Sequence, residues 1–334
     1  ALNGIINIKT KTPSFKPQTT VSSFVGFWDS PKDPRNKWWG DSLMLRNGIS
    51  LSHSEKIKNF DLNLSANHYN DRGYIKFINN QQTRISANNK LVKDKVTFGL
   101  NLNYMQRKSG LFVMWQNDTN AYIPLGGTHS PNNGNRFYID PSITYYHNSF
   151  KHVLRSRILS RNLFYNDNPN NKNNSIMSFN EYQNQFHDEN TTITSGLTIV
   201  TLKGETNSFN SQFTQDGIIT GLNYSAYLQL DQKIKKINFS IGGRYEYFDL
   251  NNTKFGQPVF RGGLNYEISN GWNLRSSFGQ GFRFPTMTEL YFKGDIGPIN
   301  LYNNPDLIPE SGWTSELGLK KVIKIRNFKG YVDL

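Results

Sequence analysis

The residues best suited to binding chemistry lie in one long predicted connection, residues 109–136, which is rich in aromatic and cationic side chains. Aromatic rings beside a cation suit a catechol or sugar ring, because each ring offers a π face and polar edges. Packing of the connection against itself would account for the same composition, and the sequence leaves both interpretations open. The candidates for ligand contact are Phe112, Trp115, Tyr122, His129 and Arg136.

No residues have the spacing of a catalytic or metal site. The six His are scattered, and no HExxH pattern occurs. The chain has no Cys, which removes thiolate metal ligands and Cys nucleophiles. Gly279 and Gly281 are followed by Phe284, where a dinucleotide fingerprint needs Gly or Ala. The sequence therefore predicts no enzyme, no catalytic residue, no metal site and no cofactor.

Charge and hydropathy exclude two further classes of protein. The 334 residues carry 38 basic and 25 acidic side chains, a net charge of +13. The basic residues are spread along the chain, which favours a solvated or lipopolysaccharide-facing surface over a nucleic-acid interface. Mean hydropathy is −0.62, and no run approaches the ~18 apolar residues of a transmembrane helix.

Strict alternation of apolar and polar residues dominates the chain. It is clearest in residues 60–67, 96–104, 222–230 and 237–247, and it predicts β-strands with one apolar and one polar face. The runs are longer than the roughly 5–6 residues of a typical soluble strand, which suits a tilted membrane crossing. The charged residues of these runs all fall on the polar face: Asp61, Arg244 and Glu246.

Connection lengths also alternate along the predicted strands. Connections after even-numbered strands are short, whereas residues 29–40, 109–136, 165–174 and 284–312 form long loops after odd-numbered ones. Short turns on one rim and long loops on the other are typical of an outer-membrane barrel. Because an odd strand number leaves a free edge, we expect an incomplete barrel. The predicted strands are 17–28, 41–53, 59–70, 82–92, 95–108, 137–147, 152–164, 175–187, 190–205, 217–231, 236–250, 257–268, 272–283, 312–321 and 327–334.

Several short patterns follow one another in order. ALNGIINIKTKTP opens the chain, LQLDQKIKKINFSIGGRYEYF starts at Leu228, GQGFRFPTMTELYF starts at Gly279 and NNPDLIPESGWTSELGLK starts at Asn303. Together they resemble the TonB-dependent outer-membrane receptors, from the end of the plug domain into the barrel. The residues that match the family's barrel motif are Phe282, Arg283, Pro285, Glu289, Tyr291, Asn304, Pro305, Leu307, Pro309 and Glu310.

The resemblance implies an all-β fold, a transmembrane antiparallel β-barrel with about 15 of the family's 22 strands. Residues 1–13 would be the end of the plug domain and residues 14–334 a partial transmembrane β-barrel. The motif would be mainly structural, with its Pro residues setting turns and Arg283 pairing with Glu289 or Glu310; contact with ligand is the alternative.

The resemblance also implies a function. It is TonB-dependent active transport of a scarce ligand across the outer membrane of a Gram-negative bacterium, with a ferric siderophore favoured. Partners would be the TonB–ExbB–ExbD complex, acting through a region N-terminal to the barrel, and outer-membrane lipid. No His lies between Pro285 and Asn304, which argues against haem. Alternatives are a passive porin or adhesin-type barrel, or TonB-dependent uptake of cobalamin or a glycan.

Overall fold

The computed structural model describes residues 12–165, 168–209, 211, 212, 214, 216–296, 299–325 and 328–334. Residues 1–11 of the expected plug end lie outside the described residues. Fifteen strands form one antiparallel sheet in which neighbours in the chain are neighbours in space, and this confirms the expected all-β fold. The strands are β1 (Gln18–Phe27), β2 (Leu45–Ile57), β3 (Phe60–Asp71), β4 (Asn80–Lys93), β5 (Val96–Phe112), β6 (His129–His147), β7 (Phe150–Tyr165), β8 (Asn168–His187), β9 (Thr191–Thr206), β10 (Ile218–Ile234), β11 (Ile237–Leu250), β12 (Thr253–Ser269), β13 (Trp272–Arg283), β16 (Glu310–Ile325) and β17 (Phe328–Asp333).

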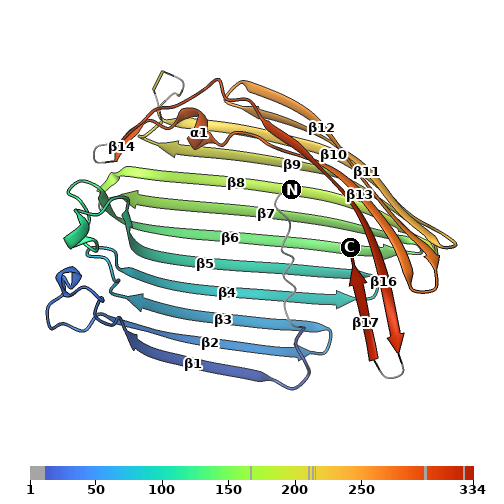
Figure 1. The fold of residues 1–334 in the computed structure, drawn as a ribbon, viewed down its shortest axis with the longest axis horizontal. Coiled ribbons are helices and arrows are strands. Elements are labelled where there is room, and N and C mark those ends of the chain that lie inside the picture. The colour runs from blue at the N-terminus through green and yellow to red at the C-terminus, as the bar shows by residue number, and fades with distance from the viewer. Residues whose placement is uncertain are drawn as a thin grey trace.

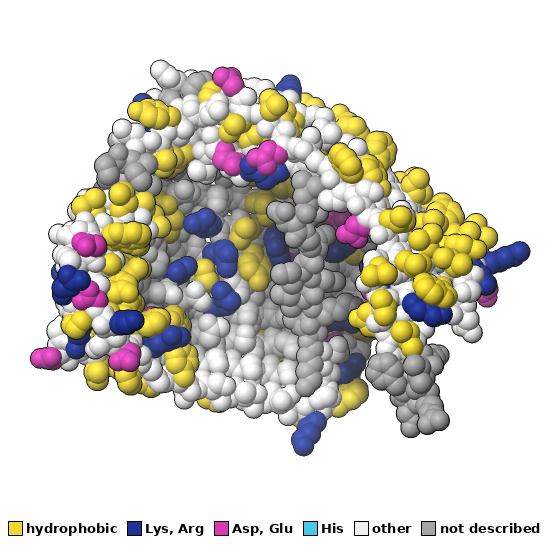
Figure 2. Space-filling view, viewed as in Figure 1, with side chains coloured by type: hydrophobic (Ala, Val, Ile, Leu, Met, Phe, Trp, Pro, Cys, Tyr) yellow, Lys and Arg dark blue, Asp and Glu magenta, His cyan; other side chains and the backbone are white. Residues whose placement is uncertain are grey.

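The sheet is curled and remains open, with β1 and β17 as its two edges (Figure 1), and its concave side is hollowed (Figure 2). A few short elements decorate the connections. These are α1 (Met287–Tyr291), the hairpin of β14 (Gly294–Ile296) and β15 (Ile299–Leu301), and the 3₁₀ turns η1 (Pro34–Asn36) and η2 (Asp118–Asn120). Among the residues that the structure describes, no helix has the length and apolar character to cross a membrane.

The two faces of the sheet differ in polarity, as the alternation predicts. Leu64, Ile85, Leu197 and Leu228 are exposed on the outer face, and Leu197 and Leu228 are each 59% exposed. Figure 2 looks into the hollow, where Lys and Arg side chains stand among uncoloured polar ones. An apolar surface of this extent is unstable in water and suits contact with lipid tails.

The strands extend further than the sequence predicted at the long-loop end. Residues 165–174 were expected to form a loop, but β7 continues to Tyr165 and β8 begins at Asn168. Residues 170–174 of β8 include no apolar side chain, yet the start of β8 pairs with β7 and, from Asn173 on, with β9, and Lys172 forms a 2.6 Å ion pair with Glu205. Strands of this length exceed the ~9–11 residues that cross a bilayer. Their outer ends can therefore be polar on both faces.

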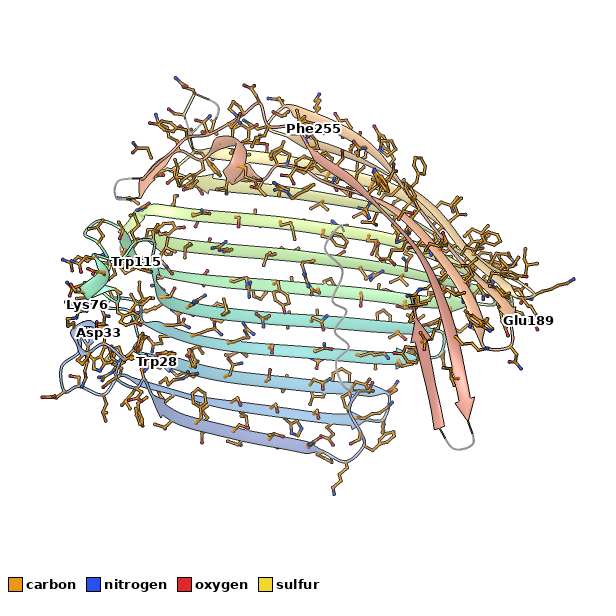
Figure 3. All side chains as sticks on the ribbon, viewed as in Figure 1. Trp28, Asp33, Lys76, Trp115, Glu189 and Phe255 are labelled. Atoms are coloured by element: carbon orange, nitrogen blue, oxygen red, sulfur yellow. The ribbon has the colours of Figure 1, made fainter. Side chains whose placement is uncertain are left out.

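The expected difference between the two rims holds. The long connections, residues 28–44, 113–128 and 284–309, all lie at the end where Figure 3 labels Trp28 and Trp115, and Glu189 lies at the opposite end. The opposite end has tight turns with left-handed backbone. Positive φ values occur there at Lys58, Asp94, Asn148, Lys235 and Gly271, as such turns require.

Candidate functional site

The connection from β13 to β16, residues 284–309, is called the motif loop below, because it carries most of the family motif. Arg283 holds its two ends together. Arg283 Nη1 donates to both carboxylate oxygens of Glu289 at 2.9 Å. Nη2 and Nε donate to Glu310 at 2.6 and 3.2 Å. The guanidinium therefore pairs with both acids that the sequence offered as alternatives.

A capping box starts α1 within the motif loop. Thr286 Oγ1 accepts from the backbone N–H of Glu289, and the Glu289 carboxylate accepts from the backbone N–H of Thr286 at 2.7 Å. Hydrogen bonds from Arg283, then those from Thr286, lower the pKa of Glu289 to about 2. The carboxylate that completes the capping box is therefore harder to protonate than that of a free Glu.

Helix α1 packs against the inner wall of the sheet. Leu290 is 0% exposed, in a cluster with Ile219, Leu250 and Tyr291. Tyr291 Oη lies 3.3 Å from the carbonyl oxygen of Leu250, to which it donates. Leu307 also packs against the cluster, so both halves of the motif loop meet it.

The remaining motif residues shape the same loop. Pro285 is buried, whereas Pro305 and Pro309 are half-buried. The Asn304 backbone donates to the Glu289 carbonyl at 3.4 Å. The Phe282 ring lies 4.8 Å from the ring of Phe284, which in turn stacks on Phe248. These contacts lie within the loop or between the loop and the strands beside it.

Aromatic rings from three connections form a second cluster at the same rim. Tyr74 lies at its centre, with ring centroids 4.4 Å from Tyr122, 5.3 Å from Trp39 and 5.5 Å from Trp28. Trp28 Nε1 donates to Asp71 at 2.9 Å and so fixes the base of the cluster. We call the rings of Trp28, Trp38, Trp39, Tyr74 and Tyr122 the aromatic loop cluster.

The five residues expected to contact ligand lie in different settings. Tyr122 is packed within the aromatic loop cluster, whereas Trp115 is 60% exposed and forms an isolated β-bridge with Pro124 of the same connection. The other three lie on strands, which corrects the expected loop of residues 109–136 to residues 113–128. Phe112 ends β5 opposite His129 at the start of β6, and His129 stacks on Phe77 at 4.8 Å. Arg136 lies within β6 and faces the hollow.

The inner wall is polar and carries paired charges along much of its length. Arg157 pairs with Asp140 at 2.6 Å. Arg155 pairs with Glu181 at 3.1 Å, and Tyr227 Oη donates to the same carboxylate at 2.8 Å. Glu181 and Tyr227 border a pocket of about 910 Å³ that spans β8 to β13 and reaches β16. Among the described residues, no group of three His, Asp or Glu is placed to hold a metal ion.

A curled antiparallel sheet with an apolar outer face and a polar inner wall defines a transmembrane β-barrel. Residues 15–334 match the family model described as TonB dependent receptor-like, beta-barrel. The chain belongs to the TonB-dependent receptors, which confirms the resemblance seen in its motifs. Members of this family are transporters of the Gram-negative outer membrane.

Solved structures share this fold. The siderophore receptor PirA from Pseudomonas aeruginosa matches with a TM-score of 0.69 at 10% identity, over 93% of this chain and 54% of that one. The FrpB iron transporter from Neisseria meningitidis gives 0.63 at 14%, over 91% and 52%. The ferric citrate transporter FecA gives 0.61 at 13%, over 93% and 50%. The chain thus spans about half the length of these proteins, and at such identities the likeness is one of fold. No curated protein matches the sequence.

Proposed function

We propose that this chain is the barrel part of a receptor that actively transports a ferric siderophore across the outer membrane of a Gram-negative bacterium. The observation that carries the proposal is a family barrel whose hollow opens toward long, aromatic-rich loops. The proteins that share its fold include a siderophore receptor and two iron transporters by name. Residues 1–13 would be the end of a plug, and the TonB–ExbB–ExbD complex would supply the energy by acting on that plug.

Ligand enters from the long-loop rim in this proposal. The exposed ring of Trp115 offers a first contact for an aromatic chelator, and Arg136 offers a cation deeper in the hollow. The other three candidates affect ligand entry through the shape of the rim, since each lies against a neighbouring strand or loop. They are Phe112, Tyr122 and His129.

Growth and uptake of a deletion strain test the proposal. We expect the strain to lose uptake of radioactive iron from at least one ferric siderophore, and to regain it with the wild-type gene only when TonB is present. Uptake that is independent of TonB would favour a passive porin. Loss confined to cobalamin or to a glycan would replace iron with that ligand, and unchanged growth on every iron source would refute the siderophore choice.

A further inference from the structure

Three arginines and one methionine occupy facing positions on four neighbouring strands of the inner wall. Arg84 on β4 is directly opposite Met105 on β5, Met105 is opposite Arg136 on β6, and Arg136 is opposite Arg161 on β7. Residues directly opposite in an antiparallel sheet share a face, with Cβ atoms about 4.5–5.5 Å apart. We call Arg84, Arg136 and Arg161 the arginine row. It lies toward the long-loop end of its strands, below the aromatic loop cluster.

The hydrogen-bond donors of the two arginines beside Met105 have few acceptors. Arg84 Nη2 lies 3.5 Å and Arg136 Nη2 lies 4.0 Å from the sulfur of Met105, which is a weak acceptor. The Nε atoms of both arginines are buried and have no hydrogen-bond partner. Buried donors normally have partners, and two cations on either side of one sulfur repel each other. The pair is therefore arranged for an acceptor that carries negative charge.

Several other arginines of the inner wall pair with neighbouring acids, as Arg155 does with Glu181, whereas Arg107 and Arg261 bond to side-chain amides. On β7 itself Arg157 pairs with Asp140, whereas Arg161, four residues nearer the rim, has no carboxylate within 4.0 Å among the described residues. The same holds in the described part of the chain for Arg84 and Arg136. The row thus brings together three cations that have no carboxylate partner among the described residues, and in two of them a buried N–H also has no acceptor.

We propose that the arginine row is an anion-binding subsite, which takes the negatively charged oxygens of an anionic ferric chelate such as a polycarboxylate or catecholate. This inference rests on the proposed function and narrows its ligand class. Guanidinium groups bind carboxylate or paired phenolate oxygens with two parallel hydrogen bonds. These bonds are stronger when the acceptor is negatively charged than when it is neutral. The row therefore selects charged chelates over neutral hydroxamate chelates, neutral glycans and cobalamin.

Calorimetric titration of the detergent-purified full-length receptor tests the subsite. The probes are ferric citrate, an anionic ferric tris-catecholate and a neutral ferric trihydroxamate. We expect Arg84→Gln and Arg136→Gln each to weaken binding of an anionic probe about 10-fold or more, as loss of charged hydrogen bonds does. Wild-type affinity should fall as salt is added. Lys90→Gln is the matched control, because it removes the same charge from the same face of β4 nearer the short-turn end.

Several results would overturn the subsite. These are wild-type protein that binds neither anionic probe, variants that bind the anionic probes as the wild type does, and an equal loss for the neutral probe. Variants that lose only thermal stability would show that the row pairs with carboxylates of the protein itself. Failure of the proposed function can be distinguished from failure of the subsite. If the purified protein binds anions through the arginine row but cells show no TonB-dependent iron uptake, the transport proposal is refuted and the subsite is not.

Discussion

Replacing Leu290 with Ala should release the motif loop from the inner wall. The Leu290 side chain is 0% exposed and packs among Ile219, Leu250 and Tyr291. Loss of its three outer carbons removes roughly 2.4 kcal/mol of transfer free energy. The cavity adds to this, and fully buried Leu→Ala changes cost about 2.7–5 kcal/mol. If α1 undocks as a unit, the open fraction of the loop rises roughly 100-fold or more, since about 1.4 kcal/mol is tenfold.

Hydrogen exchange followed by mass spectrometry measures that opening directly. We expect peptides from residues 284–309 to exchange faster by about this factor, while β3 to β6 keep wild-type protection. Ile308→Ala is the control, because Ile308 belongs to the same loop but is 76% exposed, so its truncation should change exchange little. Equal protection in Leu290→Ala and wild type would refute the docking of α1 as the source of loop order.

Three further changes probe the outer face, the capping box and the aromatic loop cluster. Leu102→Arg puts a charge on the outer face of β5 and should cost about 2–4 kcal/mol in refolding into lipid vesicles, whereas Asn101→Arg on the inner face should cost little; equal costs would contradict the assignment of the faces. Because its pKa is lowered, Glu289 stabilises the loop fully above pH 4.5, and the contribution is lost as pH falls toward 2. The rate of pepsin cleavage of the motif loop, normalised to an unfolded substrate, should rise in the wild type as pH falls from 4.5 toward 2, and should stay constant in Glu289→Gln. A cleavage rate in the wild type that does not depend on pH would count against the cap. Tyr74→Ala should speed hydrogen exchange in residues 113–128, which depend on this ring for packing, and unchanged exchange there would exclude that dependence.

Alternation identified the strands because a sheet between lipid and a polar interior needs opposite faces of opposite character. The signal fails where strands project beyond the bilayer, as at residues 170–174 of β8, which include no apolar side chain. Backbone pairing sustains those ends, and side-chain type does not reveal it. Expected loop boundaries were therefore too wide at Phe112, His129 and Arg136.

The candidate site could be anticipated only in part. Tyr122 lies among aromatic rings, but its main neighbour Tyr74 comes from a different connection, so no local pattern joins them. Arg84 and Arg161 cannot be grouped with Arg136 from the sequence alone, because only strand register brings the three into one row. A one-residue slip would move every side chain of a strand to the other face, and the sequence does not state register.

The ion pair between Arg283 and Glu310 closes the base of the motif loop, and this affects where extra sequence can be inserted. The β13–β16 ladder runs to its last pair, Arg283 and Glu310, which are also joined by their side chains. Residues inserted within the motif loop leave the strand register unchanged, and each doubling of loop length raises the free energy of loop closure by only about 0.6 kcal/mol. Tyr302 is 77% exposed within this loop. An epitope inserted beside it should leave the barrel wall unaltered, and antibody labelling of intact cells would then test the proposed outer-membrane location.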